Sequence, residues 1–242
     1  MMQPMMQRNS KGDILKAYIV MDNLTRSTSS FDDAYHRMFF NQGWSVTRVL
    51  AHADLVQFTG GSDVTPSLYG QIPHMTTSFD KYRDAREIVV FNLALKYGIP
   101  MVGICRGGQF LNVMCGGDMF QDVDNHAITG THDVIDCING DVFQATSTHH
   151  QMMDPSKDAM VLGIATNSRR REKMHKTLKL QRQFYNVGSK AEDWDDYEVV
   201  LYAEQKCLCF QPHPEFAGFP ELKDRYFQYI NDYLFEKPKL IT

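Results

Sequence analysis

The side chain best suited to covalent chemistry stands at the end of an apolar run, where Cys105 follows Gly103 by two residues and precedes Gly107 by two. Small residues at these positions let a strand and the next helix approach closely, in the turn known as a nucleophile elbow. Cys105 would then lie at a helix N-terminus, where the helix dipole favours thiolate over thiol. A small buried thiol is an equally good interpretation of this segment alone. Other segments have to decide between the two.

A second apolar run ends at His213-Pro214-Glu215. In an extended chain, residues two apart face the same way, so Glu215 can accept a hydrogen bond from one imidazole nitrogen of His213. The other nitrogen is then available to a thiol, which is the base-and-orienter arrangement of a nucleophilic triad. Taken alone, the motif is better interpreted as a loop with a solvated acid.

A third segment supplies candidate electrophilic groups. The strand expected at 55–59 is followed by Gly60-Gly61, where backbone N–H groups can face a ligand. One of these N–H groups, together with that of Arg106 after the candidate nucleophile, would form a two-donor oxyanion hole. In isolation the glycine pair indicates only a turn.

Together the three segments resemble class I glutamine amidotransferases, the group with a Cys-His-Glu triad on a flavodoxin-like sheet. The match is direct at residues 103–109, 213–215 and 60–61, and the resemblance extends over roughly residues 16–155 and 199–230. Further segments look like the γ-glutamyl-γ-aminobutyrate hydrolase branch of this group: 60–70, Arg83-Asp84 with Glu87, 111–113, 116–117, 121–122 and 147–151.

The resemblance implies a role for each matched residue. The reacting groups would be Cys105 as nucleophile, His213 as base and Glu215 as its orienter. The oxyanion would be held by the N–H groups of Gly61 and Arg106, and the substrate would be contacted by Gly60, Gln109, His149 and His150.

The implied reaction is cleavage of glutamine or another γ-glutamyl amide through a Cys105 thioester, with no cofactor. Two leaving groups stay open. Ammonia would be passed to a separate synthetase or amidoligase, whereas a larger amine would mark a stand-alone hydrolase of the γ-glutamyl-γ-aminobutyrate type. A third alternative, from another class, is a catalytically silent binding module on the same scaffold.

Composition agrees with a soluble enzyme. A net charge of −4 gives no general attraction to nucleic acid or anionic membranes, and no apolar run is long enough to span a bilayer. The five cysteines are scattered and odd in number, which favours a reducing compartment over a disulfide framework. The expected location is therefore the cytoplasm.

The alternation of short apolar strands with amphipathic helices predicts an α/β fold, which the resemblance makes flavodoxin-like: a mostly parallel sheet with helices on both faces. We expect strands at 17–21, 45–50 and 55–59, helices at 31–41 and 84–97, and a hairpin turn at Asn139-Gly140. The predicted organisation is a loose tail at 1–15 and one domain at 16–242, with a basic insertion at about 156–198.

Two other features favour plain structural interpretations. His149 and His150, with His126 and His132 upstream, suggest a metal site, but adjacent residues on an extended segment point to opposite faces and chelate poorly. We therefore expect no metal. The basic run at 169–182 is typical of a solvated face; docking to an acidic partner, or a flap over the site, is the functional alternative.

Overall fold

The computed structural model describes residues 7–9, 12–20, 30–123, 126–166, 171–172 and 195–235. Its strands are β1 (Lys16–Val20), β2 (Ser45–Val46), β3 (Leu55–Phe58), β4 (Met101–Ile104), β5 (Asp118–Phe120), β6 (Asp122–Val123), β7 (Ala127–Asp136), β8 (Val142–Thr148), β9 (Met152–Asp154), β10 (Met160–Ala165), β11 (Arg171–Glu172), β12 (Asp196–Tyr202) and β13 (Cys207–Phe210). Its helices are α1 (Ser30–Asn41), α2 (Lys81–Tyr97), α3 (Arg106–Met114) and α4 (Pro220–Ile230), with the short turns η1 (Leu50–His52), η2 (Pro66–Tyr69) and η4 (Asn231–Phe235).

The main sheet has a parallel half and an antiparallel half. Its order is β2-β1-β3-β4-β13-β12-β10-β7-β8, and the strands are parallel from β2 to β13 and antiparallel beyond. The carboxyl ends of β3 and β4 lie side by side, because Phe58 pairs with Gly103. Gly60-Gly61 and Cys105 follow these two strands directly, so both motifs reach the same edge of the sheet, where α/β proteins bind their ligands.

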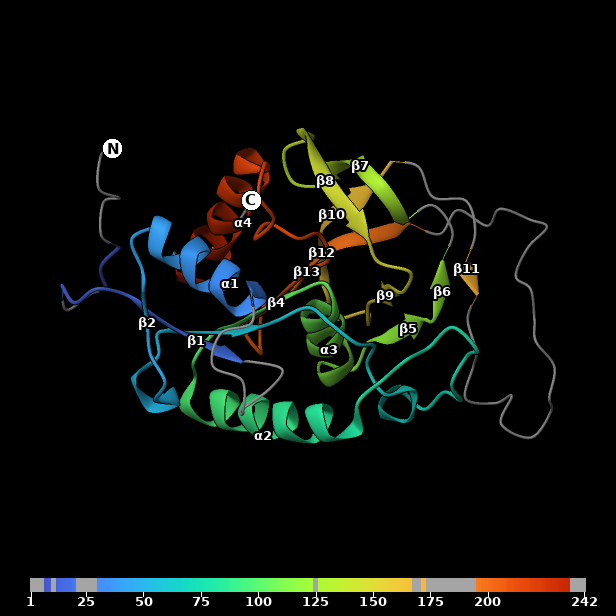
Figure 1. Ribbon diagram of the computed structural model, residues 1–242, viewed down its shortest axis with the longest axis horizontal. Helices are drawn as coiled ribbons and strands as arrows, with labels where there is room; N and C mark the ends of the chain where they lie inside the picture. Colours follow the sequence, from blue (N-terminus) through green and yellow to red (C-terminus); the bar gives the residue numbers. More distant parts are fainter. Residues whose placement is uncertain are drawn as a thin grey trace.

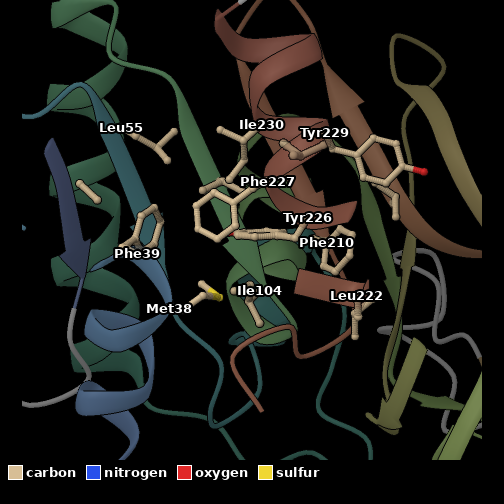
Figure 2. Packing of buried hydrophobic residues seen from close by; sticks show 14 of the residues in the cluster. Met38, Phe39, Leu55, Ile104, Phe210, Leu222, Tyr226, Phe227, Tyr229 and Ile230 are labelled. Carbon is tan, nitrogen blue, oxygen red and sulfur yellow. The ribbon is translucent and has the colours of Figure 1, made fainter. Parts of the chain in front are cut away.

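Helices cover both faces of the parallel half, as predicted (Figure 1). On one face, α1 and α4 bury an aromatic core that includes Phe39, Phe210 and Phe227, whose side chains lie close together in Figure 2. On the other face, α2 and α3 bury a second cluster, in which Phe91 and Phe110 contact each other edge to face. The flavodoxin-like α/β fold is thus confirmed. The strand before Cys105, β4, and the helix after it, α3, are both held by packing in this fold.

Two element boundaries differ from the sequence predictions by three residues or more, whereas those of β1, β3 and α1 differ by one residue. The helix predicted at 84–97 begins at Lys81, because the Asp80 side chain accepts hydrogen bonds from the N–H groups of Tyr82 and Arg83 and so caps it. The strand predicted at 45–50 ends at Val46, because the chain turns where the Thr47 hydroxyl accepts a hydrogen bond from the Val49 N–H at 3.1 Å. The hairpin turn predicted at Asn139-Gly140 joins β7 to β8, with Gly140 at φ 79°.

The predicted insertion at 156–198 is described in part. Its first residues include β10, which pairs with β7 and β12, and Arg171–Glu172 pairs with β6. The rest of the basic run at 169–182 lies outside the described residues, as do residues 1–6 of the predicted tail. Among the helices that the structure describes, none combines the length and the apolar character needed to cross a membrane.

Candidate active site

Cys105 occupies a strained turn between β4 and α3. Its backbone has φ 51° and ψ −115°, a conformation that residues other than glycine seldom adopt. The turn is tight because an added methyl group at Gly103 would collide with the Gly107 backbone, and one at Gly107 would collide with the Phe58 carbonyl. The predicted elbow is therefore present, and it places the thiol at the N-terminus of a buried helix.

The strain at this turn gives a measurable prediction. Glycine relieves a positive φ that alanine does not, so the Cys105→Gly variant should be more stable than Cys105→Ala by about 1 kcal/mol. Urea denaturation of the two variants, both lacking the thiol, measures the difference in unfolding free energy. Equal stability, or greater stability of the alanine variant, would contradict a strained elbow.

His213 and Glu215 form the predicted pair. The Nδ1 atom of His213 lies 2.6 Å from Oε1 of Glu215, and both residues are more than nine-tenths buried. The backbone N–H of His213 donates to the Thr146 hydroxyl at 2.7 Å, and its ring stacks on Phe216 with centroids 4.5 Å apart. These contacts hold the imidazole in one orientation, with Nδ1–H directed at the carboxylate and Nε2 available to another group.

The imidazole lies beside Cys105. A methyl group built on Gly60 would be 3.0 Å from Cε1 of His213 and 3.7 Å from Cβ of Cys105, so both side chains border the same glycine. Burial alone lowers the pKa of His213, but the charge of Cys105 and the hydrogen bonds to Cys105 and Glu215 outweigh it and raise the pKa to about 10. The imidazolium form of His213 is therefore favoured at neutral pH.

The raised pKa of His213 gives a pH prediction for Glu215→Gln. Glutamine keeps the hydrogen-bond acceptor but removes the negative charge, so the pKa of His213 should fall by about 1–3 units. Because imidazolium is lost as pH rises through the folded pKa, the alkaline limb of kcat/KM should move to lower pH by the same amount. Glu221→Gln, at an exposed acid on α4, serves as the control and should leave the profile unchanged. An unmoved alkaline limb in Glu215→Gln would contradict this role.

The backbone of Gly61 fits the predicted oxyanion hole. Gly61 has φ 136°, and an added methyl group would collide with the Arg83 guanidinium, so only glycine is accommodated. Within the described part of the chain, the Gly61 N–H donates to no acceptor. Arg106 is the first residue of α3, where N–H groups have no acceptor inside the helix. Gly60 differs, because its N–H donates to the Tyr35 hydroxyl at 3.0 Å.

A buried ion network, whose role the sequence did not show, joins these two backbone segments. Arg83 donates to the carbonyls of Thr59 and Gly60 at 2.8 and 3.0 Å and pairs with Glu87 at 2.8 Å. Arg106 pairs with Glu87 and with Asp84, the latter of which also accepts from the Thr65 N–H at 2.9 Å. Each of the four charged side chains is at most 3% exposed. The network therefore ties the Gly60-Gly61 turn to the start of α3.

A pocket of about 220 Å³ opens at the elbow. Glu215 instead borders a second hollow of about 320 Å³ beside α1. The predicted residues that line the first pocket are Cys105, Gly61, Arg106, Gln109, His149 and His150. The amide nitrogen of Gln109 donates to the Gln151 carbonyl at 3.1 Å, which holds this side chain at the pocket wall.

The pocket also carries charge of both signs. Nε2 of His150 lies 3.2 Å from Oδ1 of Asp63, and Nδ1 lies 3.7 Å from a carboxylate oxygen of Asp122. The hydrogen bond that His150 donates to Asp63 raises the pKa of His150, whereas burial lowers the pKa of His149. The positive charge of an imidazolium is therefore better stabilised at His150 than at His149.

Sequence reasoning missed the contributions of Asp63 and Tyr35. Asp63 stands two residues after the glycine pair, and this proximity was the available signal. Tyr35 lies on α1, far away in the sequence, and its hydroxyl accepts from Gly60. Burial raises the pKa of Tyr35, and the nearby charge of Glu215 raises it further. No local pattern around Tyr35 indicates that it borders the site.

Comparison with known proteins places this arrangement in a family. The profile of the peptidase C26 family matches residues 39–215, which is most of the chain and includes Cys105, His213 and Glu215. The chain belongs to the peptidase C26 family. This is a class I glutamine amidotransferase-like family, which agrees with the resemblance seen in the sequence.

Relatives and solved structures extend the comparison. A glutamine amidotransferase-like protein of Lactococcus lactis subsp. lactis is 28% identical over 71% of this chain and 70% of its own length. Its homologue from subsp. cremoris is 36% identical over 44% of this chain, and the chain spans about half (54%) of that relative's length. The PurLQS structure from Thermotoga maritima has a TM-score of 0.57 at 18% identity, covering 91% of this chain and 99% of that one, which shows the shared fold alone.

Proposed function

We propose that this peptidase C26 member is a cysteine-dependent hydrolase of γ-glutamyl amides, with Cys105, His213 and Glu215 as its triad. The observation that carries the proposal is one juxtaposition: the strained thiol of Cys105 opens into the 220 Å³ pocket, beside an imidazole that a buried carboxylate orients at 2.6 Å. The test is glutamate release from glutamine and from γ-glutamyl amines, by the native chain and by Cys105→Ala.

The geometry supports acyl transfer in two halves. The Cys105 thiolate attacks the γ-carbonyl carbon, and the resulting oxyanion accepts hydrogen bonds from the N–H groups of Gly61 and Arg106. The His213 imidazolium gives its proton to the leaving nitrogen, the C–N bond breaks, and a thioester is left. Neutral His213 then takes a proton from water, which attacks the thioester. Breaking the C–S bond releases glutamate and restores the thiolate and imidazolium.

The charges in the pocket favour the α-amino acid end of such a substrate. Asp63 offers a carboxylate to an α-ammonium group, and a protonated His150 offers a cation to an α-carboxylate. Gln109 lies on the same pocket wall. A γ-glutamyl group carries both of these charged groups at one end, with its amide at the other, where Cys105 stands.

His150→Gln tests this binding role. Loss of one charged contact should raise KM by about 10-fold or more while kcat changes little, because the reacting groups stay in place.

The pKa of His150 is raised above 6.5, so imidazolium is present at low pH and is lost as pH rises. KM of the native chain, measured from about pH 6 to about pH 9, should therefore rise with pH and should be flat in the variant. A KM unaffected by the substitution would contradict the assignment, with the exposed His52→Gln as control.

The leaving group separates the two forms of this function. Turnover of glutamine that requires an added synthetase or amidoligase would identify an ammonia-supplying subunit. Rapid cleavage of γ-glutamyl amines by the chain alone would identify a stand-alone hydrolase of the γ-glutamyl-γ-aminobutyrate type, which the sequence at 60–70 and 147–151 resembles. Initial rates with both substrates, with and without candidate partners, distinguish the two.

A further inference from the structure

Three histidines and two carboxylates meet in the antiparallel half of the sheet. His126 directly precedes β7, His132 lies within β7, and His149 directly follows β8, while Asp196 and Glu198 belong to β12. The side chains of all five are at most 9% exposed. Three separate stretches of sequence thus bring metal-binding side chain types to one interior point.

The spacing around Glu198 fits a coordinated ion. Oε1 of Glu198 lies 3.5 Å from Nδ1 of His126 and 3.4 Å from Nε2 of His149, and these three atoms all lie within 4.8 Å of one another. In a tetrahedral zinc site with bonds near 2.1 Å, ligand atoms are about 3.4 Å apart. The two separations from Oε1 of Glu198 therefore already match those of neighbouring ligands.

Hydrogen bonds on the far sides of the rings orient the nitrogen lone pairs. Nδ1 of His149 lies 3.0 Å from the Gln151 carbonyl, which can only accept, so Nδ1 carries the proton and Nε2 presents a lone pair. Nε2 of His126 lies 2.8 Å from Oδ2 of Asp196, so in the neutral ring Nδ1 presents the lone pair. Backbone carbonyls and carboxylates hold metal-binding histidines in this way in known sites.

The convergence suits a cation. When both rings are neutral, lone pairs of His126, His149 and Glu198 face one another, and a metal ion among them would replace this repulsion with three bonds. Glu198 is fully buried, and a divalent ion would compensate its negative charge. Two nitrogens and one carboxylate oxygen are a donor set typical of zinc, whereas magnesium and calcium prefer oxygen alone.

We propose that His126, His149 and Glu198 bind a zinc ion that clamps the ends of β7 and β8 to β12. His132, whose Nε2 lies 3.2 Å from Oε1 of Glu198, positions the carboxylate. The ion would fix His149, which lines the Cys105 pocket, and thereby its neighbour His150. The two adjacent histidines do point to different partners, as expected from the sequence; the metal partners of His149 come from distant strands instead.

The test is the zinc content of the full chain, produced without a histidine tag in zinc-supplemented medium and passed through gel filtration. We expect about one zinc ion per chain. His126→Ala should lower the content by at least about tenfold, while the exposed His52→Ala should leave it unchanged. Chelation should lower the melting temperature of the native chain, and Zn²⁺, but not Mg²⁺, should restore it.

Native protein with no more zinc than His126→Ala, and with a melting temperature that Zn²⁺ does not raise, would overturn the proposal and leave a cluster held by protons. If His126→Ala does not fold, zinc content is measured in Glu198→Gln instead, and the same loss of zinc is expected. Cobalt substitution of the native chain then gives an independent result: visible ligand-field absorption supports the site, and its absence overturns it. None of these measurements depends on Cys105 chemistry.

Discussion

Replacing Cys105 with alanine should abolish glutamate release from every γ-glutamyl substrate, with turnover falling on the order of 10⁴-fold to 10⁶-fold. The loss is this large because the other groups act only on a bond that the thiolate has attacked. Alanine keeps the strained turn and most of the packing, so the native circular dichroism spectrum and gel-filtration volume should be retained. Coupled detection of glutamate measures the effect.

The exposed Cys137 provides the matched control, since Cys137→Ala removes a thiol far from the proposed triad in the sequence. That variant should release glutamate at the native rate. A Cys105→Ala protein with unchanged turnover would refute the triad. If even the native chain shows no turnover or labelling with any γ-glutamyl amide, the alternative of a silent binding module replaces the enzyme.

Arg106→Met should be the most destabilising of the substitutions considered, costing about 3–5 kcal/mol of unfolding free energy. The guanidinium pairs with both Asp84 and Glu87, so its removal leaves two buried carboxylates with part of their charge uncompensated. The Arg106 N–H is kept, because methionine preserves the backbone. Activity should nevertheless fall, since the network also holds the Gly60-Gly61 turn through Arg83.

Urea denaturation of four variants and the native chain separates charge from packing. Arg106→Met combined with Asp84→Asn should be less destabilised than the sum of its two single changes, because the neutral amide removes one buried charge. Arg86→Met, at an exposed position on α2, the helix that carries Asp84, should stay within about 0.5 kcal/mol of the native chain. A loss below about 1 kcal/mol in Arg106→Met would contradict a structural role for the network.

The motif segments of the site could be predicted because each is local. Gly103 and Gly107 bracket Cys105, and His213 and Glu215 stand two apart, so the spacing permits an elbow and an oriented imidazole, and the segments taken together predict both. The parallel strands followed from the alternation of apolar runs and helices. This part of the fold can be predicted without knowing which strands pair with each other.

The remaining interactions depend on pairing between distant segments. Arg83, Asp84 and Glu87 share one helix, and their link to Arg106 appears only when α2 packs near α3. Glu198 meets His149 because β12 and β8 belong to the same antiparallel half, with β10 and β7 between them in the sheet order. Neither contact leaves a pattern in the sequence that differs from an ordinary polar face.

The role of Cys105 as nucleophile is tested most directly by site-resolved labelling with a thiol-reactive glutamine analogue, such as a chloroketone, followed by peptide mass spectrometry. We expect one label on the peptide that contains Cys105, blocked by excess glutamine or γ-glutamyl substrate, while exposed Cys137 reacts more slowly and without protection. Cys105 left unlabelled in the folded chain, or labelled no faster than Cys137 and without protection, would contradict it.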